Sequence, residues 1–160
     1  MFKEINGLPG HVLIVHAVVV FVPLLAVLSA AYGLAPRWRH RLDWAVAILA
    51  VVTPILAFVA TQSGEAFQEA LEKKGYPPEL LAKIHEHSEY GDKLLWFTVG
   101  LAVAALLLLA LTSPRIRTPE LPVWVTWVLI GIVVVLAVLA LVYAYLTGDS
   151  GAQAVWGNTL

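Results

Sequence analysis

Three histidines are the side chains in this sequence best suited to chemistry, and two of them stand where a polar residue is unexpected. His11 and His16 fall within residues 5–36, an apolar stretch that contains no Asp, Glu, Lys or Arg. An ionisable side chain in a stretch long enough to cross a bilayer is costly to insert, so it marks a candidate functional site. The third, His87, lies in the polar middle of the chain.

A metal centre or a haem site is the chemistry that these histidines suggest. Three imidazoles with carboxylates nearby suit a divalent Zn, Cu or Ni ion, and two imidazoles from different helices suit the axial positions of a b-type haem. We predict metal ligation by His11, His16 and His87. The predicted supporting polar cluster consists of Glu65, Asp92, Asp149 and Ser150.

The spacing of the first two histidines sets a condition on this site. They are five residues apart, which separates them by about 140° on a helix of 3.6 residues per turn. Both can face one ion only if His11 lies outside the regular helix, as Pro9 and Gly10 permit. The alternative is that each histidine hydrogen-bonds a carboxylate or a backbone group and fixes the helix packing without binding anything.

The composition is that of a membrane protein. Of the 160 residues, 60% are hydrophobic and 13% are charged, whereas soluble domains are about 25% charged; the mean hydropathy is +0.83. The formal net charge is −1, and the chain has no basic tail that would give the positively charged face needed for nucleic-acid binding. The chain has no cysteine, which excludes disulfides, thiolate metal sites and thiol nucleophiles.

Long windows without charge define the elements that must position the histidines. Four such windows occur, and each exceeds the roughly 18 residues expected of a membrane-crossing helix. We predict an all-α fold, an antiparallel bundle of four transmembrane helices in a single membrane domain, residues 1–160. The predicted spans are 11–34, 44–62, 93–112 and 122–147, with an outer helical segment at 63–92.

The positive charges predict the orientation of the bundle. All five arginines fall in the two short connections, and all five lysines fall on the other side of the predicted spans. The positive-inside rule places the dense arginine clusters in the cytoplasm. Both termini, segment 63–92 and the candidate site then lie on the extracytoplasmic side.

The two halves of the chain share a short motif. The second predicted span ends in TQSGEA, residues 61–66, and the fourth ends in TGDSGA, residues 147–152. Each half would be a two-helix unit, and such repeats can form a site at their interface. We expect the Ser-Gly pairs to end helices, with Gly64 and Gly151 free to adopt a positive φ angle.

Four segments resemble a known family. They are GLPGHVLIVHAVVVFVP (7–23), TQSGEAFQEAL (61–71), HSEYGDKLL (87–95) and TGDSGAQAVWG (147–157). They are similar to the actinobacterial branch of the small bacterial membrane proteins called domain of unknown function 2231. The resemblance implies a four-helix protein of the bacterial inner membrane, with no assigned activity. The wider family has proline after the first histidine and phenylalanine and proline after the second, where this chain has Val12 and Ala17.

The sequence favours a non-enzymatic protein, because it contains neither a G-x-S-x-G nor an H-E-x-x-H motif. The leading hypothesis is a histidine and carboxylate cluster at the outer face that binds a transition metal ion or a b-type haem. The alternative is a structural or accessory membrane subunit whose polar cluster only fixes helix packing. A proton-coupled carrier is a third, weaker alternative. The expected partners are the lipid bilayer and a homo-oligomer or a larger membrane complex, without nucleic acid.

Overall fold

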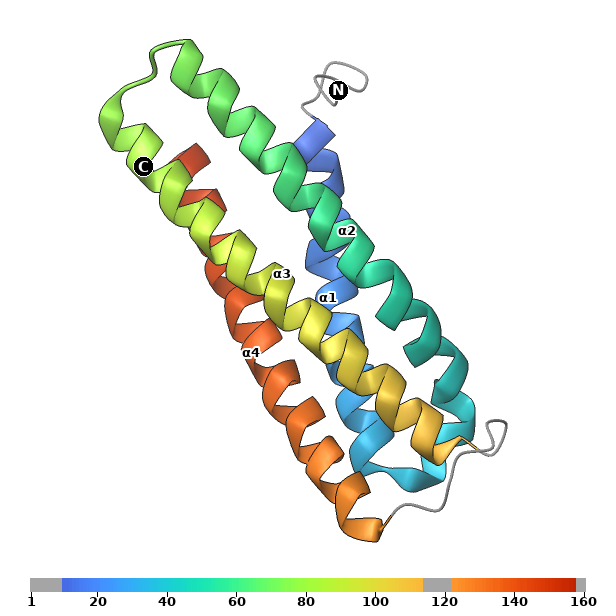
Figure 1. The fold of residues 1–160 in the computed structure, drawn as a ribbon. Coiled ribbons are helices and arrows are strands. Elements are labelled where there is room, and N and C mark those ends of the chain that lie inside the picture. The colour runs from blue at the N-terminus through green and yellow to red at the C-terminus, as the bar shows by residue number, and fades with distance from the viewer. Residues whose placement is uncertain (1–9, 114–121, 158–160) are drawn as a thin grey trace.

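Four long helices account for most of the part of the chain that the structure describes (Figure 1). The computed structural model describes residues 10–113 and 122–157. The helices are α1 (Gly10–Leu34), α2 (Arg39–Lys73), α3 (Pro78–Thr112) and α4 (Val123–Trp156), with a short 3-10 helix, η1 (Pro36–Trp38), between the first two. Each of the four is long and apolar enough to cross a membrane. The predicted all-α, multi-pass fold is therefore confirmed.

Side-chain contacts between helix ends fix the direction of each helix. His11, at the start of α1, contacts Ser63 in the last third of α2 and His87 in the first third of α3. His87 in turn contacts Ser150, near the end of α4. The end of α1 contacts the end of α3 through Tyr32 and Thr112. Thus α1 and α3 run in the same direction, and α2 and α4 run back between them (Figure 1). We call the end with His11 and His87 the histidine end and the opposite end the arginine end.

Two of the helices extend well past the histidine end. Residues 63–92 do not form a separate element, because α2 continues unbroken to Lys73 and α3 already begins at Pro78. Gly75, with a φ angle of 71°, makes the turn between them. Good helix formers fill positions 65–73, so nothing stops α2 before this glycine. At 1.5 Å per residue, α2 extends about 15 Å beyond Ser63.

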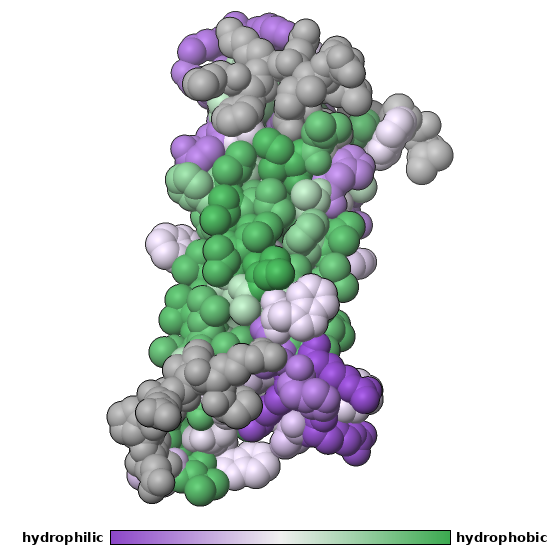
Figure 2. Space-filling model, turned by 90° about the vertical axis from the view of Figure 1, so that its right-hand side faces the viewer, coloured by the Kyte–Doolittle hydropathy of each residue, from purple (hydrophilic) through white to green (hydrophobic). Residues whose placement is uncertain are grey.

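The bundle interior is apolar and rich in small residues. Alanines make up nearly half of the buried hydrophobic side chains, which lets the helix backbones approach one another closely. The outward faces are also apolar, and Figure 2 shows them as a band between polar ends. A lipid-facing band of this kind is what a spanning bundle requires, since lipid tails offer no hydrogen bonds.

Hydrogen bonds join the helices at the arginine end. The Thr112 hydroxyl donates to the Leu108 carbonyl at 2.7 Å, so its oxygen accepts from the Tyr32 hydroxyl at 2.9 Å. Arg39 donates through Nε to the Tyr32 carbonyl at 3.1 Å and through Nη2 to the Gly33 carbonyl at 3.2 Å. These carbonyls lie in the last turn of α1, where they have no partner within the helix. The buried Tyr32 therefore joins α1 to α3, while Arg39 caps α1.

Replacing Tyr32 with phenylalanine tests the contact between α1 and α3. Tyr32→Phe keeps the buried ring and removes only the hydroxyl, and Thr112 keeps its bond to Leu108. We expect the free energy of unfolding in detergent to fall by about 1 kcal/mol. The control is Tyr145→Phe, because Tyr145 is 71% exposed on α4. Equal losses in the two variants, measured by circular dichroism during denaturation, would contradict this account.

Candidate functional site

His11 is held by the end of α2. Its Nδ1 lies 3.0 Å from Ser63 Oγ and 3.1 Å from the Ala60 carbonyl oxygen. The Ser63 hydroxyl donates its one proton to the same carbonyl, at 2.8 Å. Ser63 Oγ must then accept from His11, and a carbonyl can only accept. Nδ1 of His11 therefore carries the proton, and Nε2 carries a free lone pair.

His87 repeats this arrangement at the end of α4. Its Nδ1 lies 3.1 Å from Ser150 Oγ, and the Ser150 hydroxyl donates to the Thr147 carbonyl at 3.1 Å. Ser150 Oγ accordingly accepts from Nδ1 of His87, which leaves Nε2 unprotonated in this ring as well. We call these two arrangements, one in each helical hairpin, the half-sites.

The glycine next to each serine supports the imidazole ring. A Cβ atom added to Gly64 would lie 3.0 Å from Cε1 of His11, and one added to Gly151 would lie 2.9 Å from Cε1 of His87. Both glycines lie inside helices, and the one described glycine with a positive φ angle is Gly75. The expectation that the Ser-Gly pairs end helices is wrong. They serve instead as close contact points for the histidines, because a helix can accommodate glycine without a break.

The two half-sites meet through their rings. The centroids of His11 and His87 are 6.4 Å apart, with the ring planes at 83°. His11 also stacks on Phe67 of α2, with a centroid distance of 6.4 Å and an angle of 15°. The histidine pair therefore links the α1–α2 hairpin to the α3–α4 hairpin.

Comparison with known proteins now identifies the family. The sequence model of a family described as "Predicted membrane protein (DUF2231)" matches residues 7–160. The chain belongs to this family. The match includes both half-sites and confirms the resemblance seen in the four sequence segments. No curated protein and no solved structure matches the chain.

The other predicted ligand does not join the pair in this DUF2231 protein. His11 lies within α1, which begins at Gly10, so the condition for sharing an ion with His16 is not met. The side chain of His16 is exposed on the surface of α1. Within residues 10–113 and 122–157, no group of three or more His, Cys, Asp or Glu side chains is placed to hold a metal ion.

The predicted carboxylates lie on the outside of the bundle, and only the serine of the supporting cluster contacts a histidine. Glu65 accepts from Gln62 at 3.1 Å, and Asp149 accepts from Gln153 at 2.8 Å, each on its own helix. Asp92 is exposed on α3. Ser150 contacts His87, as described above.

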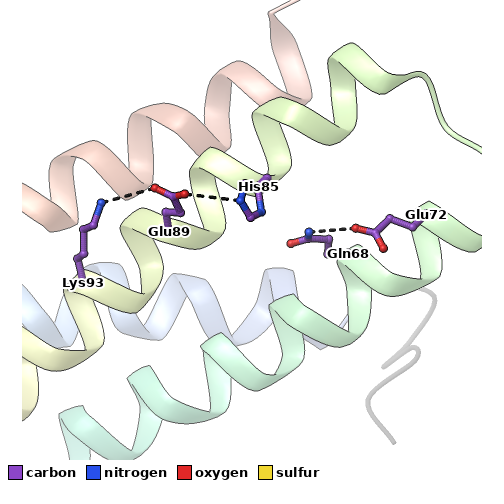
Figure 3. Close-up of polar contacts among 5 residues, drawn as sticks. All are labelled: Gln68, Glu72, His85, Glu89 and Lys93. Carbon is purple, nitrogen blue, oxygen red and sulfur yellow. Dashed lines mark hydrogen bonds and ion pairs between the residues drawn. The ribbon is translucent and has the colours of Figure 1, made fainter.

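Polar side chains on the projecting helices form a separate, solvated surface. His85 lies 3.5 Å from Glu89, which also pairs with Lys93 at 3.6 Å, and all three are well exposed (Figure 3). On α2, Gln68 donates to Glu72 at 3.1 Å. These pairs follow the four-residue spacing of neighbours on a helix surface, so they belong to their own helices and not to the half-sites.

Buried polar groups occur at separated depths in the bundle. The hydroxyls of Thr53 and Thr98 are fully buried and have no hydrogen-bond partner. Thr53 lies ten residues from Ser63 along α2, which places it about 15 Å deeper. The buried residues between these depths are mostly apolar. The described residues thus offer no continuous polar path for a proton-coupled carrier.

Sequence reasoning gave neither Ser63 nor Phe67 a role in the site, although both lie in a segment that resembles the family, and it gave none to Asp43 at the opposite end of the bundle. Ser63 is an acceptor for His11, and Phe67 stacks on the same ring. The repeated Ser-Gly motif was a signal for Ser63, but nothing in the sequence pairs Phe67 with a histidine. At the arginine end, Asp43 is buried. The only sequence feature that could have drawn attention to Asp43 is its position just after three arginines.

Alanine substitutions of the two glycines test the half-sites. Gly64→Ala and Gly151→Ala place a methyl group against the imidazole rings. Each should push the ring from its serine and lower the free energy of unfolding by about 1–3 kcal/mol.

Gly148→Ala is the matched control, because this position lies on the same helix as Gly151 with no heavy atom within 4 Å of an added Cβ. Alanine there should leave stability unchanged or raise it, since it favours the helix over glycine. Thermal unfolding, monitored by circular dichroism, compares the stabilities of these glycine variants. Equal stabilities of Gly148→Ala and Gly151→Ala would show that the rings are not held as described.

Proposed function

We propose that this DUF2231 protein is a non-enzymatic structural or accessory membrane subunit, built from two similar hairpins that the histidine pair holds together. The observation that carries the proposal is the set of contacts that each imidazole ring makes. Nδ1 is bonded within its own hairpin, and the ring contacts the opposite hairpin. The hydrogen bonds of His11 and His87 thus contribute to packing.

The physical setting favours such a role. Apolar side chains gain little by moving from lipid to a helix interface, so packing geometry and polar contacts decide how membrane helices associate. A polar contact at each end of the bundle therefore selects one register of the helices. Tyr32 with Thr112 supplies it at the arginine end, and the histidine pair supplies it at the histidine end.

The three-histidine metal centre and the haem site receive less support. His16 lies away from the pair, and the carboxylates face outward. The cavity beside Ser150, between α3 and α4, measures about 90 Å³, whereas ligand pockets usually measure about 300–1,000 Å³. Neither His11 nor His87 lines this cavity.

The projecting part of α2 and α3 is the surface that we propose for a partner subunit. It carries exposed charged side chains from both helices, including Glu69, Lys73 and Glu86. The proposed location is the bacterial inner membrane, with this surface and both termini on the extracytoplasmic side. Exposed Arg37 and Arg41 at the opposite end support this orientation. Arg115 and Arg117, which entered the same prediction, lie outside the described residues.

Substituting the histidines tests the packing role. His11→Ala and His87→Ala each remove a half-buried ring and a hydrogen bond, and we expect each to lower the free energy of unfolding by about 2–4 kcal/mol. Because the rings touch, the double variant should deviate from the sum of the single effects by about 0.5–3 kcal/mol. Denaturation in detergent with EDTA present measures all three values.

His85→Ala is the control for this experiment, because His85 is exposed on the projecting surface. It should change stability by less than about 0.5 kcal/mol. If the three single variants are equally stable, or if the effects of His11→Ala and His87→Ala simply add, the histidine pair does not join the hairpins.

Cysteine labelling tests the orientation, since the chain contains no native cysteine. Glu86→Cys introduces a thiol at the exposed histidine end, and His40→Cys introduces one at the exposed arginine end. A membrane-impermeant maleimide should label only Glu86→Cys in intact spheroplasts and should label both after permeabilisation. The reverse labelling pattern would invert the proposed orientation.

A further inference from the structure

The Nε2 atoms of the histidine pair have no role in the packing described so far. Both hydrogen-bond networks place the proton on Nδ1, which leaves a lone pair on Nε2 of each ring. A histidine that ligates a metal through Nε2 almost always donates its other N–H to a carbonyl, carboxylate or water. His11 meets this description through the Ala60 carbonyl. The Ser150 hydroxyl takes the corresponding place for His87.

The separation of the rings is close to that of two imidazoles on one ion. An ion about 2.0 Å from each Nε2 lies roughly 3 Å from each ring centroid, so two rings on one ion have centroids at most about 6 Å apart. The observed centroid distance is 6.4 Å. The proposed site therefore requires the two rings to move slightly closer, with both Nε2 atoms turned toward the shared ion.

The donor atoms define the class of ion. Two neutral imidazoles without thiolate suit Cu²⁺, Ni²⁺ and Zn²⁺ and disfavour Mg²⁺ and Ca²⁺, which prefer oxygen. We propose that Nε2 of His11 and Nε2 of His87 bind one divalent transition-metal ion across the two hairpins, with water completing the coordination. The proposed site has two protein ligands and excludes His16.

This binding would strengthen the link that the proposed packing function assigns to the same residues, and it rests on the same ring positions. An ion that ligates one residue from each hairpin stabilises only the assembled bundle. It therefore raises the stability of the folded state by an amount that grows with the logarithm of the ion concentration relative to its dissociation constant. Ser63 and Ser150 act as positioning residues, because they hold the proton on Nδ1 and keep Nε2 available.

Cu²⁺ binding to the untagged, full-length protein tests the proposal. After removal of metal with EDTA, addition of one equivalent of Cu²⁺ should give an electron paramagnetic resonance spectrum with splitting from two imidazole nitrogens. Affinity should follow the order Mn²⁺ < Ni²⁺ < Cu²⁺ > Zn²⁺, with no binding of Mg²⁺.

His11→Ala and His87→Ala should abolish the two-nitrogen pattern, whereas His85→Ala should keep it. Ser150→Ala should weaken binding about 10–100-fold. Ser63→Ala should weaken it less, because the Ala60 carbonyl still accepts from Nδ1 of His11.

Several outcomes would overturn the metal site. They are a wild-type spectrum without two nitrogens, a signal that survives both histidine substitutions, and a signal lost in His85→Ala, which would place the ion on the projecting surface. The wild-type spectrum decides the question even if a histidine variant fails to fold. The packing function fails on a different result, unchanged stability of the histidine variants in EDTA, so the two proposals can fail separately.

Discussion

The structure depends on a constraint that lipid imposes on helix association. A helix in the bilayer already has its backbone hydrogen bonds satisfied and its apolar side chains in contact with lipid. Moving those side chains from lipid to a helix interface therefore adds little free energy. Close contact of small residues and a few polar bonds must then decide which helices meet and in what register. Alanines allow the close contact along the interior of this bundle. The polar bonds are made by Tyr32 and Arg39 at one end and by the half-sites at the other.

The two half-sites have the same local arrangement of side chains. In each hairpin, a histidine near the start of one helix meets a Ser-Gly pair near the end of the next. The serine oxygen accepts a hydrogen bond from the imidazole N–H because the serine hydroxyl donates its own proton to a carbonyl three residues earlier. Glycine admits the ring at a distance that any Cβ would obstruct. Equivalent contacts in both halves of the chain give physical meaning to the short sequence repeat.

The sequence indicated the four spanning helices and the end of the bundle at which His11 and His87 meet, because charge-free windows and loop positions determine both. It could not determine the rotation of each helix about its axis. His16 was expected to face His11, yet α1 is already regular at Gly10, so the two rings point in different directions. Asp149 was expected beside the histidines, yet its neighbour Ser150 occupies that face of α4. Contacts of this kind follow from helix rotation and spacing, which a single sequence does not encode in any pattern that can be read directly.

The placement of the half-sites also bears on how the protein is inserted into a membrane. The His11 contact with Ser63 lies wholly within residues 10–73, and the His87 contact with Ser150 lies wholly within residues 78–156. Each hairpin can therefore satisfy its own imidazole as soon as it leaves the insertion machinery, before the other hairpin has been made. Only the ring-to-ring contact must wait for the complete chain. Biogenesis can thus proceed as two self-contained insertions followed by one docking step, with no unpaired imidazole Nδ1–H left in the bilayer in between.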